Sequence, residues 1–194
     1  MNSDSETCNN LCRNYQKWKD TASICYSTEW FNVLENESYY SVEHKEDQVM
    51  VLPIVENSKI VLVKARRPVL GKSLWELPAG GVKNGENYAE TAKREMAEET
   101  GIKVANLDRF HESQSFVLAS NRMPMFPKVF YINLTNREYL KKDEFDEEIE
   151  QVKAFSFEET VESIVQGDLF ATLPIAVISK FLFTRKLHIP SPTI

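Results

Sequence analysis

Three glutamates at helical spacing are the residues of this sequence best placed to do chemistry. Glu95, Glu98 and Glu99 occur at positions i, i+3 and i+4, so a helix would present all three carboxylates on one face. Like charges at that spacing repel one another by about 0.2–0.5 kcal/mol per pair, and a cation would relieve that repulsion. Oxygen-only ligands suit Mg²⁺ or Mn²⁺, which keep several waters and bridge to substrate phosphates. The alternative interpretation of these three residues alone is a solvated acidic face.

The residues around the glutamates extend this spacing into a longer pattern. From Gly80 to Ile102 the segment reads G-x5-E-x7-R-E-M-x-E-E-x-G-I. This segment resembles the complete signature of the Nudix hydrolase family, with every specified position filled. Average residue usage would produce such a match at roughly one in 10^9 starting points, so the resemblance outweighs the interpretation as a solvated face.

The resemblance implies a fold and a metal site. The implied fold is α+β, an α/β/α sandwich in which a mixed β-sheet lies between helices. The implied reaction is metal-assisted hydrolysis of a diphosphate linkage in a nucleoside diphosphate joined to another group. Glu95, Glu98 and Glu99 would be the catalytic carboxylates and metal ligands, and Gly80 would add its backbone carbonyl. The implied cofactor is Mg²⁺, with Mn²⁺ as a second possibility, because such an ion lowers the pKa of a bound water and neutralises diphosphate charge.

Three further positions of the motif have structural roles by the same resemblance. Glu86 and Arg94 would hold the helix against the preceding loop, with Arg94 paired to the acidic cluster. Gly101 follows directly after the helix predicted over 88–100, where a glycine cap is typical.

Residues before the motif narrow the substrate class. Arg66 and Arg67 end an apolar stretch, and Glu76 lies in the sequence W-E-L-P-A-G that leads into the motif. This order resembles the ADP-ribose and nucleotide-sugar diphosphatase branch, which implies that Arg66 or Arg67 contacts substrate phosphate. Glu76 would be a carboxylate on the substrate or metal side. Leu118 stands where ADP-ribose hydrolases usually have a proline, which weakens ADP-ribose specifically but not the nucleotide-sugar class.

An acidic loop follows later in the chain. Residues 143–150 hold six acids in eight positions. The resemblance implies that one of these carboxylates assists as a general base, and Glu147 fits the branch's pattern E-x-I-x-x-V best. Glu144 and Glu148 remain alternatives, and a solvated loop tip is the structural alternative for all three.

The hydrophobic pattern predicts the elements that position these residues. We expect strands over 29–34, 38–44, 49–54, 60–63, 74–79, 129–134 and 152–157, and helices over 88–100, 158–166 and 172–185. Residues 1–28 are predicted to be a short helix or a mobile arm, and 137–150 a charged loop. The predicted units are an N-terminal polar arm with a strand extension (1–45), a Nudix domain (46–187) and a tail (188–194).

Composition excludes several classes of protein. The chain has 194 residues, of which 42% are hydrophobic and 27% charged, with a net charge of −6. This is an ordinary globular balance without a chain-wide basic surface for nucleic acid or anionic membrane. Neither a signal peptide nor an apolar run long enough to span a membrane is recognisable. Cys8, Cys12 and Cys25 are an odd, clustered set, which suggests reduced thiols and a cytoplasmic location.

The leading hypothesis is therefore a Mg²⁺-dependent diphosphatase acting on a nucleotide-sugar such as ADP-ribose, giving a nucleoside monophosphate and a sugar phosphate. The alternatives are a nucleoside triphosphate or dinucleoside polyphosphate hydrolase, and a non-catalytic nucleotide-sugar sensor. Dimers are common in the resembled branch, so a homodimer is expected. Trp30 and Phe31 would suit its interface or could fill their own core.

Overall fold

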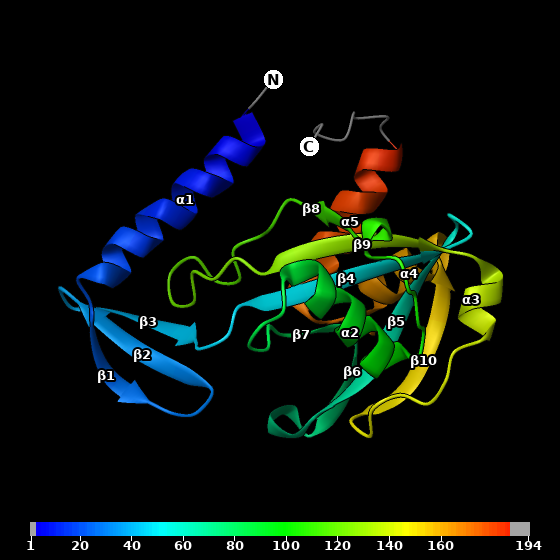
Figure 1. Ribbon diagram of the computed structural model, residues 1–194, viewed down its shortest axis with the longest axis horizontal. Helices are drawn as coiled ribbons and strands as arrows, with labels where there is room; N and C mark the ends of the chain where they lie inside the picture. The colour runs from blue at the N-terminus through cyan, green and yellow to red at the C-terminus, as the bar shows by residue number, and fades with distance from the viewer. Residues whose placement is uncertain (1–2, 187–194) are drawn as a thin grey trace.

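The computed structural model describes residues 3–186 and shows a mixed-sheet body with a separate N-terminal unit (Figure 1). The helices are α1 (Ser3–Asp20), α2 (Tyr88–Thr100), α3 (Asn136–Leu140), α4 (Phe157–Gln166) and α5 (Thr172–Lys186), with short 3-10 turns η1 (Pro68–Leu70) and η2 (Leu107–Arg109). The strands are β1 (Ser23–Ser27), β2 (Phe31–Asn36), β3 (Tyr39–His44), β4 (Gln48–Val55), β5 (Lys59–Arg67), β6 (Lys72–Glu76), β7 (Ala79–Gly81), β8 (His111–Ser113), β9 (Lys128–Leu134) and β10 (Ile149–Ser156). The predicted tail 188–194 and residue 187 lie outside the described residues.

The body is built on a seven-stranded mixed sheet. Its main path has the order β10-β5-β4-β9-β8, with β6 paired to β5 and β7 paired to β4. The β4–β9 pair is parallel, whereas the other pairs in this sheet are antiparallel. The strands β4 to β7 follow one another, helices α4 and α5 close the chain, and most strand pairs are antiparallel, which is the predicted α+β arrangement.

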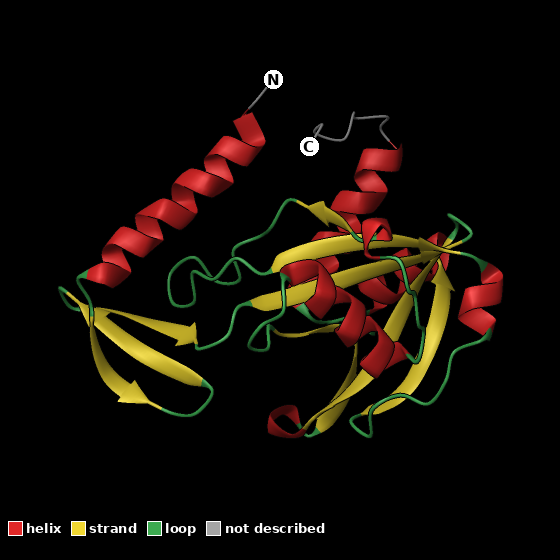
Figure 2. Ribbon diagram, in the orientation of Figure 1, coloured by secondary structure: helices red, strands yellow, loops and turns green. Residues whose placement is uncertain are grey.

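Helices cover both faces of the sheet, and alternate residues of β5 mark the two layers (Figure 2). Val63 lies in the same buried cluster as Met96 of α2, whereas Leu62 lies in the cluster that contains Ile178 of α5. All four side chains are almost completely buried. Successive strand residues point to opposite faces, so the register of β5 decides which of its side chains face α2.

The N-terminal unit consists of α1 packed on an antiparallel β1-β2-β3 sheet. The Asn36 side-chain amide donates to the Trp18 carbonyl at 3.0 Å, and Lys19 forms an ion pair with Glu43. The prediction of a short helix or mobile arm was therefore wrong in extent, because α1 has 18 residues. Strand β1 was missed as well; its five residues are all exposed, so no buried alternation marks it.

Two predicted boundaries inside the body also differ. The strand predicted over 74–79 is divided into β6 and β7, because Pro78 has no N–H for the ladder; its carbonyl instead accepts from the Val51 amide at 2.8 Å. The predicted loop 137–150 contains α3, which begins at a capping box formed by Thr135 and Glu138. Within the described residues, none of the helices is long and apolar enough to span a membrane.

Candidate active site

Local signals define both ends of α2, the helix that carries the three glutamates. Asn87 caps its first turn in a capping box with Glu90. Gly101 ends it with φ of 71°, and its amide donates to the Ala97 carbonyl at 2.9 Å. A Cβ on Gly101 would lie 2.2 Å from the carbonyl oxygen of Asp143. Two separate reasons therefore favour glycine at this position: its backbone is left-handed, and the acidic loop approaches too closely for a side chain.

The glutamates meet strand β7 at the glycine that opens the motif. Glu95 is 7% exposed, and a Cβ on Gly80 would lie 2.2 Å from its carboxyl carbon. The Ala79 amide donates to Oε2 of Glu99 at 3.2 Å. Glu98, with a side chain 36% exposed, lies at the solvent side of the group. Because Gly80 has no side chain, the Glu95 carboxylate can lie directly against the backbone of β7.

Arg94 joins this carboxylate group to the loop before the helix. Its Nη1 donates to Oε1 of Glu95 at 2.6 Å and to Oε2 of Glu98 at 2.9 Å. Its Nε donates to Oε1 of Glu86 at 2.8 Å, and its Nη2 to the Gly81 carbonyl at 2.8 Å. The pairing with Glu86 raises the pKa of Arg94 and lowers that of Glu86 to about 2. The guanidinium thus connects α2 to the loop between β7 and α2.

Burial raises the pKa of two of the carboxylates. Desolvation raises the pKa of Glu99 to about 8, although the Ala79 amide partly opposes this. Desolvation also raises the pKa of Glu95, against the effect of Arg94. Carboxylate oxygens are the donors that a hard divalent cation takes, so the chemistry of Glu95, Glu98 and Glu99 fits Mg²⁺ or Mn²⁺. In their arrangement here, however, no group of three or more His, Cys, Asp or Glu side chains among the described residues is placed so that it could hold a metal ion.

The register of β5 separates the two candidate substrate arginines. Arg67 continues the alternate row of Val63 and Ala65, which faces α2, whereas Arg66 continues the row of Leu62 on the opposite face. The Arg67 guanidinium forms a fork with Glu76, with Nε to Oε1 at 3.0 Å and Nη2 to Oε2 at 2.8 Å. The structure thus brings Arg67 and Glu76, but not Arg66, to the carboxylate side of the sheet.

The acidic loop is attached to the same region through its backbone. The Asp146 amide donates to the Glu98 carbonyl at 2.9 Å, and the Arg66 amide donates to the Glu148 carbonyl at 2.9 Å. The side chains of Glu144, Glu147 and Glu148 are all exposed. The loop therefore lies beside the C-terminal end of α2, and nothing in its geometry selects one of the three carboxylates.

One residue near the site was not singled out from the sequence. The ammonium of Lys83 lies 3.8 Å from Oε1 of Glu98 and has a side chain 60% exposed. Lys83 is the basic residue between Gly80 and Glu86. Its position inside the motif is the sequence feature that could have identified it.

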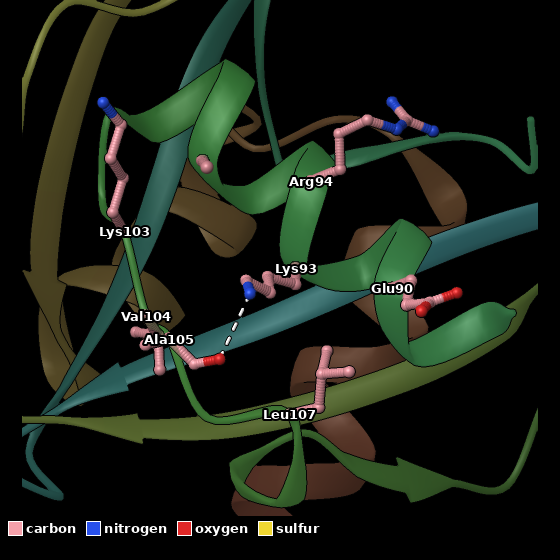
Figure 3. A pocket seen from close by; sticks show the side chains of 8 residues that line it. Glu90, Lys93, Arg94, Lys103, Val104, Ala105 and Leu107 are labelled. Atoms are coloured by element: carbon pink, nitrogen blue, oxygen red, sulfur yellow. Dashed lines mark hydrogen bonds between the residues drawn. The ribbon is translucent and has the colours of Figure 1, made fainter. Parts of the chain in front are cut away.

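A hollow of about 540 Å³ lies on another flank of α2 (Figure 3). Its lining includes Lys93, whose ammonium donates to the Ala105 carbonyl at 3.1 Å, and Leu107. In Figure 3, Arg94 extends from α2 away from these residues. Glu95, Glu98 and Glu99 do not line it, so this hollow is separate from the carboxylate group.

The fold and the carboxylate helix together define a Nudix domain. The family profile described as NUDIX domain matches residues 44–171, and the chain belongs to the Nudix family. A crystal structure of an ADP compounds hydrolase superposes with a TM-score of 0.63 at 14% identity, covering 85% of this chain and 92% of that one. At that identity the superposition confirms the predicted fold alone.

Curated relatives with several substrate names are similar to part of this chain. The chain is 34% identical over 105 residues to an ADP-ribose pyrophosphatase of Bacillus subtilis (strain 168), covering 53% of this chain and 56% of that protein. It is 38% identical over 60 residues to an 8-oxo-dGTP diphosphatase of Buchnera aphidicola subsp. Schizaphis graminum (strain Sg), covering 31% and 46%. It is 39% identical over 61 residues to an ADP-sugar pyrophosphatase of Mus musculus, covering 29% and 28%. The chain thus spans about half the length, or less, of these relatives, and the predicted resemblance to the ADP-ribose branch is confirmed.

Proposed function

We propose that this chain hydrolyses the diphosphate linkage of a nucleoside diphosphate sugar such as ADP-ribose, releasing a nucleoside monophosphate and a sugar phosphate. The observation that carries the proposal is the Arg67–Glu76 fork on the face of the sheet that α2 covers with its half-buried Glu99 and buried Glu95. The arginine that would bind the substrate phosphate is thus on the same side of the sheet as the carboxylate oxygens that would bind the cation. The similarity to an ADP-ribose pyrophosphatase and an ADP-sugar pyrophosphatase supports the same substrate class.

The residues of the site have separate roles in this proposal. Glu95, Glu98, Glu99 and the Gly80 carbonyl would hold Mg²⁺, for which Mn²⁺ can substitute. The ion would supply neutralisation of the diphosphate and a bound water of lowered pKa. Glu147, the best candidate of the acidic loop, would accept the proton of the attacking water. Arg94 has the structural role of keeping α2 and its carboxylates against the preceding loop.

The test is a product screen with Mg²⁺ and a panel of substrates. The panel contains ADP-ribose, ADP-glucose, UDP-glucose, GDP-mannose, NADH, diadenosine polyphosphates and nucleoside triphosphates, with products separated by chromatography. We expect a nucleotide-sugar to give equal amounts of nucleoside monophosphate and sugar phosphate, and no activity in EDTA. Hydrolysis of triphosphates or dinucleoside polyphosphates alone would refute the substrate class. Tight nucleotide-sugar binding without products would favour a sensor.

We also propose that the protein is a homodimer formed through its N-terminal unit. Trp30 is 72% exposed, and edge strand β1 adds exposed Ile24 and Tyr26 beside it. An exposed edge strand with apolar side chains is a surface that natural proteins usually cover. Light scattering after size exclusion should give twice the chain mass of 22.4 kDa. Trp30→Asp should yield the monomer, whereas Phe183→Asp, which changes an exposed aromatic residue on α5, should remain dimeric.

A further inference from the structure

The Arg67–Glu76 fork uses two of the five N–H donors of Arg67 and engages both carboxylate oxygens of Glu76. Each carboxylate oxygen of Glu76 accepts one hydrogen bond, from Nε at 3.0 Å and from Nη2 at 2.8 Å. The remaining nitrogen, Nη1, makes only a long contact of 3.4 Å with the Arg66 carbonyl. Nη1 and the second N–H of Nη2 are therefore donors of Arg67 that a substrate oxygen can take without breaking the fork.

The fork lies within the electrostatic reach of the catalytic helix. Glu76 is paired with Val63 across the β5–β6 ladder, and Arg67 lies further along the same face of the hairpin. Glu76 is the main cause of the raised pKa of Arg67, and Glu99 and Glu148 contribute to it.

We propose that Glu76 is a positioning residue that holds Arg67 ready for the substrate diphosphate and does not contact the substrate itself. This inference rests on the proposed function and deepens it. The Glu76 side chain is 16% exposed and that of Arg67 is 39% exposed, so the carboxylate is the covered partner and the guanidinium the accessible one. A pre-ordered arginine binds phosphate without the entropic cost of immobilising a long side chain.

Two readouts separate positioning from direct contact. The first is the Kd of ADP-ribose in EDTA by titration calorimetry, which does not depend on the metal ion. The second is the split between KM and kcat for ADP-ribose with Mg²⁺. The proteins compared are the wild type, Glu76→Gln, Arg67→Gln and the double variant. Ser73→Ala is the matched control, because the Ser73 hydroxyl donates to Glu150 at 2.5 Å from the same strand but on its other face.

We expect Glu76→Gln to raise both Kd and KM about 5- to 10-fold, the effect of freeing one side chain, while kcat changes less than about 2-fold. The double variant should bind like Arg67→Gln alone, because Glu76 acts only through Arg67. Ser73→Ala should match the wild type. Thermal unfolding confirms that each variant is folded, and Glu76→Asp, which is too short for the fork, replaces Glu76→Gln if that variant does not fold.

Each contrary result has one interpretation. An unchanged Kd in folded Glu76→Gln would overturn the positioning role, as would a further loss when Glu76→Gln is added to Arg67→Gln. A fall in kcat at constant KM would show that Glu76 acts on the reacting atoms directly, and would overturn it too. A wild type that neither binds nor hydrolyses any nucleotide-sugar would instead refute the proposed function, which separates the two failures.

Discussion

Replacing Gly101 by alanine tests whether the residue that caps the C-terminal end of α2 must lack a side chain. Gly101 has φ of 71°, and a left-handed conformation costs a residue with a Cβ about 1–2 kcal/mol. The new Cβ would also lie 2.2 Å from the Asp143 carbonyl oxygen. Because that neighbour is backbone, the loop must shift, which adds about 1–3 kcal/mol. The expected loss in the free energy of unfolding is therefore about 2–5 kcal/mol.

The matched control is Gly167→Ala at the C-terminal end of α4. Gly167 has φ of 80° and caps its helix in the same way, but a Cβ there would meet no atom within 4 Å. This variant should lose only the conformational part, about 1–2 kcal/mol. Urea unfolding of the wild type and both variants gives the comparison, provided that the m-value stays constant. In thermal unfolding, each kcal/mol corresponds to about 2–4 °C for a domain of this size.

The difference between the two variants isolates the contact with the acidic loop. We expect Gly101→Ala to be less stable than Gly167→Ala by about 1–3 kcal/mol. Equal losses would refute the reasoning, because they would mean that Asp143 and its loop yield to a methyl group without cost. A larger loss for Gly167→Ala would contradict it as well.

Three further results follow from the structure. Glu98→Gln and Glu99→Gln should each lower kcat/KM at least ~100-fold in a folded protein, as expected for metal ligands; near-normal turnover would exclude the metal assignment. Arg109 holds the pKa of Glu138 at about 2, below its ordinary 4.5, so the stabilisation is complete above about pH 4.5 and is lost as the pH falls toward 2. Both side chains are partly exposed, so Glu138→Gln should cost only about 1 kcal/mol at pH 7 in chemical denaturation, and the difference from the wild type should close in acid; a gap independent of pH would contradict the assignment. EDTA should abolish hydrolysis of the best substrate and Mg²⁺ should restore it, and full activity in EDTA would rule out the divalent cation.

Much of the catalytic helix could be predicted from the sequence because its determinants are local. Spacing of three and four residues places Glu95, Glu98 and Glu99 on one helix face whatever surrounds them. The predicted helix over 88–100 matches α2, and Gly101 caps it as expected. The two C-terminal helices were also predicted within a residue or so at each end.

The N-terminal unit shows where local pattern fails. Helix α1 has few apolar side chains, and its position depends on contacts with β2 and β3 such as the Asn36 bond to the Trp18 carbonyl. Such contacts join residues distant in sequence, so no window of the chain reveals them. Exposed strand β1 is defined by its pairing with β2 and not by its own composition.

The sequence by itself determined the family, the helix and the spacing of its carboxylates, since these depend on neighbours within a few turns. The tertiary structure alone decided which of two adjacent arginines lies on the side of the sheet that α2 covers. Alternation along a strand put Arg66 and Arg67 on opposite faces, but only the packing of Met96 on the Val63 row showed which face belongs to α2. The fork to Glu76 depends likewise on the register of two strands, and hydrogen bonds across a sheet are fixed by tertiary packing.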